Sequence, residues 1–467
     1  MYREEIEKYM EDHRQEMLED ICTLCRINSE KMPYQTGMPF GRGTAEALAC
    51  ALSLGEKYGF AINNYDNYVG TIDLNGGESR LDILAHLDVV PAGDGWTETE
   101  PFVPVIRDGK LYGRGTADDK GPAVAALYAM RAVRDLGIPV SGNTRLILGT
   151  DEECGSSDIA HYYKVEKEAP MTFSPDSHFP VTNIEKGSLP GDFAAEFEKS
   201  TALPRLVSFR SGTKRNVVPA RAEAVIQGMA AGEVMRLAQE AGKDLDIRFS
   251  VTASDGAVTI CAEGENSHAS KPWKGKNALT GLLAFLCRLP MADCPQMEKV
   301  RSLNALMPHQ DVTGEALGIA MEDEISGPLT LAFSLLTITE DHLEGGFDSR
   351  CPICANEENV LNVAKKAMKK HGITLSNESM RPPHHVSGES DFVKTLNRCY
   401  EMYTGNKGDC VAIGGGTYVH DLQNGVAFGA SMPGTENRMH GPDEFAVVED
   451  LMTSAKIFAQ VIAELCA

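Results

Sequence analysis

The sequence of 467 residues lacks an excess of positive charge and contains no long uninterrupted run of apolar residues. Its 44 lysines and arginines are outnumbered by 67 aspartates and glutamates, which gives a formal net charge of −23. A surface of this sign repels phosphate backbones and anionic lipids, so binding to nucleic acid or to a membrane surface is disfavoured. Because no stretch reaches the roughly 18 apolar residues that a membrane-spanning helix needs, we expect no transmembrane segment.

An apolar leader is also missing at the start of the chain. The first residues, 1–5, run into a charged, amphipathic stretch, whereas a secretory signal has an apolar central region. We therefore expect a cytoplasmic protein whose 12 cysteines are reduced thiols. No internal repeat or low-complexity tract is evident, and a content of 42% hydrophobic and 24% charged residues is ordinary for a globular protein.

Two C-x-x-C pairs, Cys22/Cys25 and Cys351/Cys354, allow a four-cysteine zinc site as one interpretation. Their surroundings favour a different one. The first pair lies in a helical pattern, in which cysteine acts as a small hydrophobic residue, and the second pair flanks a Pro-Ile dipeptide that is more typical of a strand.

The chain is too long for one hydrophobic core, because cores stop growing at roughly 250–300 residues, and two domains are expected. An opening helix is predicted over 3–28. Three short apolar runs follow, with an alanine-rich helix between the first two, and this alternation predicts an α/β sheet of mostly parallel strands flanked by helices. The runs are 81–85, which ends at His86; 144–150, which ends at Asp151-Glu152-Glu153; and 171–175, which ends at Asp176. Ligands of such sheets bind beyond the carboxyl ends of the strands, where these polar residues lie.

The pattern changes at about residue 187, where glycine-rich turns, alternating apolar residues and further helices predict an α+β segment that ends near residue 385. From residue 386 onwards a helix, a glycine-rich loop and an apolar strand at 426–428 resume the first pattern. We therefore predict a discontinuous catalytic domain, 1–186 and 386–467, with a lid domain inserted at 187–385.

The polar residues after the strands, together with two loops, form a candidate set of metal ligands. The set comprises His86, one carboxylate of Asp118-Asp119, one of Glu152-Glu153, Asp176 and His440. Two imidazoles and three carboxylates can hold two divalent ions if one carboxylate bridges them, and the second glutamate is then free to take a proton from water. Mixed nitrogen and oxygen ligands suit zinc, with manganese or cobalt as alternatives. Taken singly, each histidine could also have a purely structural role, and each acidic residue could also lie in a solvent-exposed turn.

The motif His86-Leu87-Asp88 adds a supporting residue, Asp88, to this set. Alternation along a strand places Asp88 on the same side as His86, so that its carboxylate can hold the imidazole in one tautomer.

In their order and separation these motifs resemble the dinuclear-zinc superfamily of carboxypeptidase G, aminoacylase and the bacterial dipeptidases, and most closely the PepV-type dipeptidases. The resemblance extends over essentially the whole chain and rests on residues 85–91, 113–122, 149–153, 175–176, 414–418 and 439–440. It implies a zinc exopeptidase fold of the phosphorylase/hydrolase-like class, with a lid of two ferredoxin-like units.

The resemblance also implies individual roles at the metal centre. His86 and Asp176 would bind one zinc ion, Glu153 and His440 the other, and Asp118 would bridge them. Glu152 would be the general base, and the Asp118–Asp119 peptide bond would be cis.

In the lid, the resemblance implies that His268 is the histidine that reaches over the substrate, and that Asn216, Arg350 and Gly415 bind substrate. A lid of about 200 residues has room for two α+β units, so the chain could supply His268 to its own site, and we predict a monomer. The sequence differs from the family pattern at His420, because relatives usually have an arginine shortly after the Gly-Gly-Thr-Tyr stretch.

The function implied is hydrolysis of unblocked dipeptides, with broad specificity of the Xaa-His dipeptidase kind. A metal-bound hydroxide would attack the scissile carbonyl, Glu152 would transfer the proton, His268 would stabilise the oxyanion and Arg350 would bind the terminal carboxylate. An N-acyl-amino-acid deacylase of the same superfamily is an alternative, but the large lid and Arg350 favour dipeptides. A catalytically silent metal-binding or peptide-binding protein is another, disfavoured because the ligands, the base and the lid histidine are all present.

Overall fold

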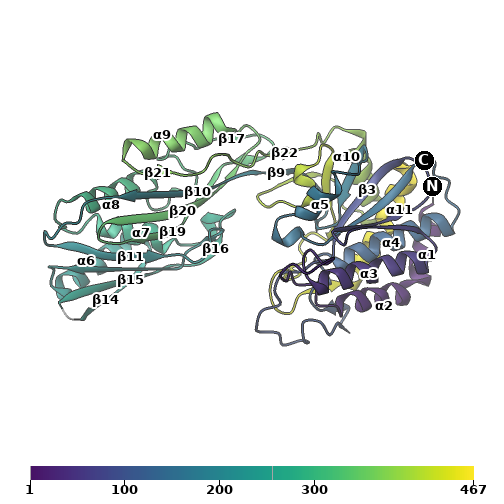
Figure 1. Cartoon of the computed structure of the whole chain (residues 1–467), viewed down its shortest axis with the longest axis horizontal. Coiled ribbons are helices and arrows are strands. Elements are labelled where there is room, and N and C mark those ends of the chain that lie inside the picture. Colours follow the sequence, from purple (N-terminus) through teal and green to yellow (C-terminus); the bar gives the residue numbers. More distant parts are fainter. Residues whose placement is uncertain (1, 255) are drawn as a thin grey trace. The chain divides into compact units, whose positions relative to one another are not determined.

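A computed structural model describes residues 2–254 and 256–467 and divides the chain into two compact units (Figure 1). Unit 1 runs to Ile184 and is completed by His385–Val411 and Gly416–Ala467, and unit 2 comprises Glu185–His384 and Ala412–Gly415. The predicted lid segment, 187–385, omits the short return of the chain to unit 2 at Ala412–Gly415.

Unit 1 is built on a nine-stranded sheet, in the order β1-β2-β6-β3-β7-β24-β9-β22 with β23 beside β9. The strands are β1 (Ala61–Tyr65), β2 (Val69–Asp73), β3 (Ser79–His86), β6 (Asn143–Gly149), β7 (Met171–Ser174), β9 (Val181–Glu185), β22 (His384–His385), β23 (Cys410–Ile413) and β24 (Gly425–Phe428). The three central pairs, β3–β6, β3–β7 and β7–β24, are parallel, which confirms the predicted parallel strands. The pairs β1–β2, β2–β6 and β24–β9 are antiparallel, so the sheet is mixed.

Helices cover the two faces of this sheet unequally. They are α1 (Arg3–Asp12), α2 (Arg14–Cys25), α3 (Arg42–Lys57), α4 (Lys120–Asp135), α5 (Ser157–Tyr162), α10 (Asp391–Thr404) and α11 (Val448–Leu465). Side chains of β3 alternate between two cores: Ile83 packs with α1–α4, α10 and α11, whereas its neighbour Leu84 packs with α5. The predicted opening helix is divided in two at His13, whose ring stacks on Tyr9 and whose Nδ1 bonds to the Tyr9 carbonyl.

Unit 2 contains an eight-stranded sheet in the order β14-β15-β13-β11-β19-β20-β10-β21, in which all neighbours are antiparallel. Its strands are β10 (Gly187–Glu196), β11 (Arg205–Ser211), β13 (Arg221–Gln227), β14 (Arg248–Ser254), β15 (Ala257–Glu263), β19 (Thr330–Ile338), β20 (His342–Cys351) and β21 (Thr374–Leu375). Four helices share one core with it: α6 (Ala231–Leu245), α7 (Ala278–Leu286), α8 (Pro295–Leu306) and α9 (Asn362–Lys370). Two four-stranded halves meet at the β11–β19 pair, as expected for an α+β lid of two units.

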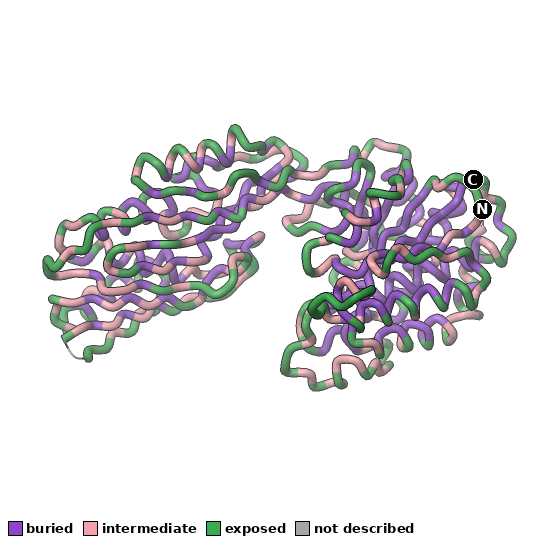
Figure 2. Tube along the Cα trace, in the orientation of Figure 1, coloured by how far each residue is buried: buried purple, intermediate pink, exposed green. Residues whose placement is uncertain are grey.

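Short elements complete both units. They are β4 (Val105–Arg107), β5 (Lys110–Tyr112), β8 (Ser177–His178), β12 (Val217–Val218), β16 (Ser267–His268), β17 (Glu322–Asp323), β18 (Gly327–Pro328), β25 (Ala430–Ser431), β26 (Phe445–Val447) and the single turns η1 (Glu152–Cys154), η2 (Pro272–Lys274), η3 (Glu357–Leu361) and η4 (Tyr418–Asp421). Each unit has a core of its own, visible as buried segments in Figure 2. Within the described residues, no helix combines the length and the apolar character that crossing a membrane requires. All 12 cysteines are free thiols, and Cys25 is a buried member of the core, in agreement with the helical interpretation.

Candidate metal centre

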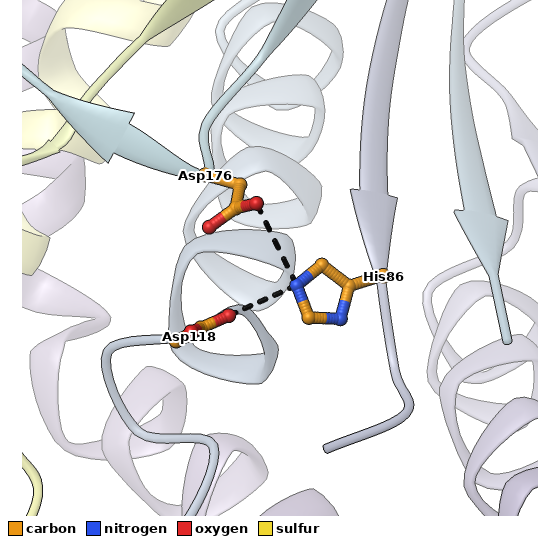
Figure 3. Close-up of side chains that lie close together, drawn as sticks. All are labelled: His86, Asp118 and Asp176. Atoms are coloured by element: carbon orange, nitrogen blue, oxygen red, sulfur yellow. Dashed lines mark hydrogen bonds and ion pairs between the residues drawn. The ribbon is translucent and has the colours of Figure 1, made fainter. Parts of the chain in front are cut away.

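Three neighbouring parallel strands of unit 1 deliver polar side chains to one edge of the sheet. β3 ends at His86, β7 is followed by Asp176, and β6 is followed by η1, which contains Glu152 and Glu153. Because parallel strands end at a common edge, residues that are far apart in sequence become neighbours there. Figure 3 shows the His86 ring facing both Asp176 and a third residue, Asp118, which lies just before α4.

The five predicted ligands form two groups that share Asp118. One group is His86, Asp118 and Asp176, the other is Asp118, Glu153 and His440, and in each group ligand atoms lie within 4.8 Å of one another. The Nε2 atom of His86 lies 2.9 Å from Asp118 Oδ1, and the Nε2 atom of His440 lies 3.0 Å from Asp118 Oδ2. The two imidazoles therefore face different oxygen atoms of one carboxylate, which is the arrangement that a bridging ligand requires.

The remaining distances close each group. Asp176 Oδ2 lies 3.7 Å from His86 Nε2, and Glu153 Oε1 lies 3.1 Å from His440 Nε2. His86 and Asp118 are buried, whereas His440 is exposed. The peptide bond between Asp118 and Asp119 is cis, as the resemblance implies.

The electrostatics of these groups fit divalent cations. Burial, followed by the nearby charge of Asp118, raises the pKa of Asp176 well above its usual range. Burial opposes ionisation of Asp118 too, but hydrogen bonds from His440 and His86 outweigh it and lower its pKa. Hydrogen bonds to Asp118 and Glu153 raise the pKa of His440 to about 10. Positive charge is thus needed among these carboxylates, and without a cation the histidines must supply it by holding protons.

A buried oxygen atom beside the groups supports the same conclusion. Asp119 accepts a hydrogen bond from the backbone N–H of His86 through Oδ2, at 3.2 Å, but its Oδ1 atom finds no donor among the residues that the structure describes. Burial raises the pKa of Asp119 well above its usual value. A buried carboxyl group with an unpaired oxygen atom is costly, and a cation held by the neighbouring ligand groups would offset that cost.

The orientation of His86 leaves its Nε2 atom available. Its Nδ1 atom donates to the backbone carbonyl of Asp88 at 3.0 Å, while the Asp88 carboxylate lies 3.5 Å away. That carboxylate instead accepts the backbone N–H groups of Glu152 and Glu153, each at 3.1 Å. The ring is therefore held mainly by the Asp88 carbonyl, and the Asp88 carboxylate orients the two glutamates.

At least three supporting residues were missed by sequence reasoning, and two of them hold the end of β6. Tyr418 donates to Asp158 Oδ2 at 2.5 Å, and the same oxygen atom accepts the backbone N–H of Asp151 at 2.9 Å. The Tyr418 ring also packs edge-on against the His86 ring, with centroids 6.3 Å apart. The third, Lys120, is buried and donates to the carbonyl of Ile27 at 2.8 Å. Of these three, Tyr418 and Lys120 lie in the motifs 414–418 and 113–122 that carry the family resemblance, whereas nothing in the sequence marks Asp158.

We expect replacement of Gly149 by alanine to destabilise unit 1 by about 3 kcal/mol, the upper part of the range for overpacking a core. A Cβ atom at this position would lie 2.1 Å from the Tyr418 hydroxyl and 2.6 Å from Asp158 Oδ2. Both neighbours are buried and bonded to each other, so neither can move without loss of that bond. Chemical denaturation measures the effect. Gly76→Ala is the control, because its Cβ would meet nothing within 4 Å, and an equal loss of stability in both variants would contradict the explanation.

The other predicted site residues, Asn216, His268, Arg350 and Gly415, all belong to unit 2. His268 pairs with Val217 in the β16–β12 ladder, next to Asn216. Arg350, near the end of β20, binds the Asp348 carboxylate through Nε and Nη2 and donates from Nη1 to the carbonyl of Gly414 at 2.8 Å. His420, where relatives usually have an arginine, is buried in unit 1.

Comparison with known proteins agrees with this geometry. The model of the family described as Peptidase family M20/M25/M40 matches residues 83–464. The Bacillus subtilis (strain 168) protein YtjP is 37% identical over 459 residues, which are 97% of each chain. The Beta-Ala-Xaa dipeptidase of Lactobacillus delbrueckii subsp. lactis is 34% identical over 462 residues, which are 96% of each chain. Among solved structures, human carnosine dipeptidase 1 is similar in fold, with a TM-score of 0.60 at 16% identity, covering 100% of this chain and 99% of the other.

Proposed function

Because the chain belongs to peptidase family M20/M25/M40, we propose that this metallopeptidase is a dipeptidase of the PepV type that cleaves unblocked dipeptides at a centre of two divalent ions. The observation that supports this best is the sharing of Asp118 between His86 and His440. The resemblance to a Beta-Ala-Xaa dipeptidase over nearly the whole length of both chains supports dipeptides as the substrate class.

The donor set suggests which residues hold which ion. We assign His86 and Asp176 to one ion and Glu153 and His440 to the other, with Asp118 as the ligand of both. Zinc is the proposed metal because it accepts mixed imidazole and carboxylate ligands, and manganese and cobalt are the alternatives.

Glu152 is the proposed general base. Bound divalent ions supply a Lewis acid that polarises the scissile carbonyl and acidifies the attacking water. Glu152 accepts the proton of that water and then donates it to the leaving amine. Its backbone N–H is bonded to Asp88, which fixes the start of η1. Burial, followed by repulsion from Glu153 and Asp118, raises the pKa of Glu152, and divalent cations beside it would offset that rise.

His268 is the proposed donor to the oxyanion that forms at the attacked carbonyl. Its Nδ1 atom lies 2.7 Å from the Ser270 hydroxyl and accepts the Ser270 backbone N–H at 3.2 Å. Two donors at Nδ1 leave the proton of the neutral ring on Nε2, which is the tautomer needed for donation to substrate. Burial, followed by the positive charge of Arg350, lowers the pKa of His268 and favours this neutral form.

Arg350 is the proposed partner of the substrate's terminal carboxylate. Asp348 occupies one side of its guanidinium and the Gly414 carbonyl another. One N–H on Nη1 and one on Nη2 are left over, and such a pair matches the two oxygen atoms of a carboxylate. Asp348 and Gly414 thus hold the guanidinium in a fixed orientation.

Arg350→Ala is expected to raise the KM for dipeptides by about 10- to 100-fold with a smaller change in kcat, because a charge-assisted bidentate contact contributes roughly 1.5–3 kcal/mol. Steady-state kinetics on a dipeptide and on its C-terminal amide measure the effect. The amide lacks the carboxylate, so its hydrolysis should change little. Arg205→Ala is the matched control, since Arg205 belongs to the same unit and binds Glu340 and Gln227. Unchanged kinetics of Arg350→Ala would remove this residue from the substrate site.

The proposed monomer follows from the sheet of unit 2, which already joins two α+β halves through β11 and β19 within one chain. Static light scattering at micromolar concentration tests it. An obligate dimer would contradict this part of the proposal.

The whole proposal is tested by metal analysis together with a substrate panel. Purified protein should contain two ions per chain and should release amino acids from free dipeptides, while N-acetylated amino acids and longer peptides should be poor substrates. Preference for N-acyl amino acids would instead establish the deacylase alternative. Two bound ions with no turnover of either class would indicate a silent binding protein.

A further inference from the structure

A buried ion pair joins the two loops that present Asp118 and His440. Arg114 is 1% exposed and Glu444 is fully buried, and the Glu444 carboxylate accepts Arg114 Nη1 at 2.5 Å. Neither residue is one of the five ligands, and the proposed mechanism assigns neither a task.

The backbone contacts of Glu444 all lie in the loop before Asp118. Its Oε1 atom accepts the backbone N–H groups of Gly115, Ala117 and Asp118, at 3.0, 3.1 and 3.3 Å. One carboxylate oxygen atom therefore contacts the backbone at three positions, up to and including the shared ligand. The loop has no regular ladder of its own, and these three bonds hold it together with the bonds from the Arg114 N–H to the Pro101 carbonyl and from the Thr116 hydroxyl to the Gly113 carbonyl, each at 2.8 Å.

Arg114 makes the reciprocal contact with the loop of His440. Its Nη2 atom donates to the carbonyl of Gly441 at 3.1 Å. Three non-glycine residues of this loop, Arg438, His440 and Asp443, have left-handed backbone conformations, with φ of 56°, 61° and 54°. Such conformations are costly for residues with a side chain and persist only where surrounding contacts hold them.

The two loops are continuations of one antiparallel pair. In the β5–β26 ladder Tyr112 is opposite Phe445, and the backbone N–H of Gly113 donates to the carbonyl of Glu444 at 2.9 Å. Beyond this point the strands separate, and the Arg114–Glu444 ion pair joins the two chain segments. Asp118 lies four residues after Arg114, and His440 lies four residues before Glu444.

We propose that the Arg114–Glu444 pair positions Asp118 and His440 relative to each other. This positioning allows the second group, Asp118, Glu153 and His440, to bind its ion. This proposal rests on the proposed two-ion centre. The first group should depend on the pair less, because His86 and Asp176 are attached to β3 and β7 rather than to either loop. Loss of the pair should therefore weaken the two metal sites unequally.

Glu444→Gln and Glu444→Ala test this proposal as a graded pair. Glutamine keeps one oxygen atom for the backbone N–H groups but loses the charge that balances Arg114, and alanine removes both functions. Metal-free proteins are titrated with Co²⁺, and visible absorption and calorimetry report the affinity of each site. We expect the ion of the second group to lose at least tenfold in affinity in Glu444→Gln and more in Glu444→Ala, with a smaller loss at the other site.

Asp82→Asn is the matched control, because Asp82 forms a buried ion pair with Arg145 in the same unit and accepts its hydrogen bonds from Arg145 and Ala169 rather than from the loops of Asp118 and His440. It should lower the melting temperature while both Co²⁺ affinities stay at the wild-type values. If Glu444→Gln lowers the melting temperature in the same way and titrates like wild type, the pair is merely structural and the proposal is wrong. Equal weakening of both sites would overturn it as well.

Failure of the proposed function gives a different result. If the wild-type protein takes up a single ion, the two-ion centre is wrong, whatever the variants do. The affinity for that one ion in Glu444→Gln then decides whether the pair positions its ligands.

Discussion

Replacement of Asp118 by alanine is expected to abolish dipeptide hydrolysis and to release both metal ions. Its Oδ1 and Oδ2 atoms face His86 and His440, so the change removes one ligand from each group at once. The remaining donors of each group are one histidine and one carboxylate, too few for a stable site of a divalent ion in water. Activity should fall below detection at any added zinc concentration that leaves the protein soluble.

Metal content after dialysis and hydrolysis of a dipeptide measure the result. Asp20→Asn serves as the control, because Asp20 is also buried in unit 1 but accepts its hydrogen bonds from Tyr58 and Tyr128, apart from the ligands. Retention of two ions by Asp118→Ala would show that Asp118 does not bridge. Loss of only one ion would assign Asp118 to a single site.

Three positions of the proposed metal centre could be predicted from the sequence because strand order determines where the strand ends meet. His86, Asp176 and the pair Glu152-Glu153 each follow an apolar run, and parallel pairing of β3 with β6 and β7 places the ends of these runs together. No fine detail of packing is needed for that step. Successive side chains of the apolar run in β3 point to opposite faces of the sheet, and both faces are covered, as the separate cores of Ile83 and Leu84 show.

The residues that orient the ligands could not be predicted in this way. Tyr418 binds Asp158 across 260 positions of sequence, and Arg114 binds Glu444 across 330. Such pairs depend on which loops the finished fold brings together, and a lone buried tyrosine or glutamate has no periodic pattern. A mostly parallel sheet was predicted, but which strands run antiparallel could not be assigned, because a strand's direction is set by its connections and not by its composition.

Asp88 illustrates the difference at a single position. Alternation correctly puts its carboxylate within 3.5 Å of the His86 ring. The backbone N–H groups of Glu152 and Glu153 are closer, at 3.1 Å each, and they point at the carboxylate from the start of η1. A sequence pattern can place a side chain on one side of a strand, but the competition between its partners is decided by the fold.

The neighbouring carboxylates Glu152 and Glu153 should give opposite results when each is changed to glutamine. Glu152→Gln is expected to keep both ions and to lose on the order of 10³-fold in kcat, within the range that a general base contributes. Glu153→Gln is expected to lose the ion of the second group, because Glu153 Oε1 lies 3.1 Å from His440 Nε2. Metal analysis and kcat, measured on both variants under the same conditions, separate the two roles.

Each variant is the control for the other, since both residues lie in η1 and both backbone N–H groups bind Asp88. A general disturbance of η1 would therefore affect both variants alike, in metal content and in turnover. Loss of metal from Glu152→Gln with retention in Glu153→Gln would exchange the two assignments. Added zinc should restore activity to Glu153→Gln in part, because its base is intact, and should not restore Glu152→Gln, because a correctly filled centre without a proton acceptor still lacks the step that makes water a nucleophile.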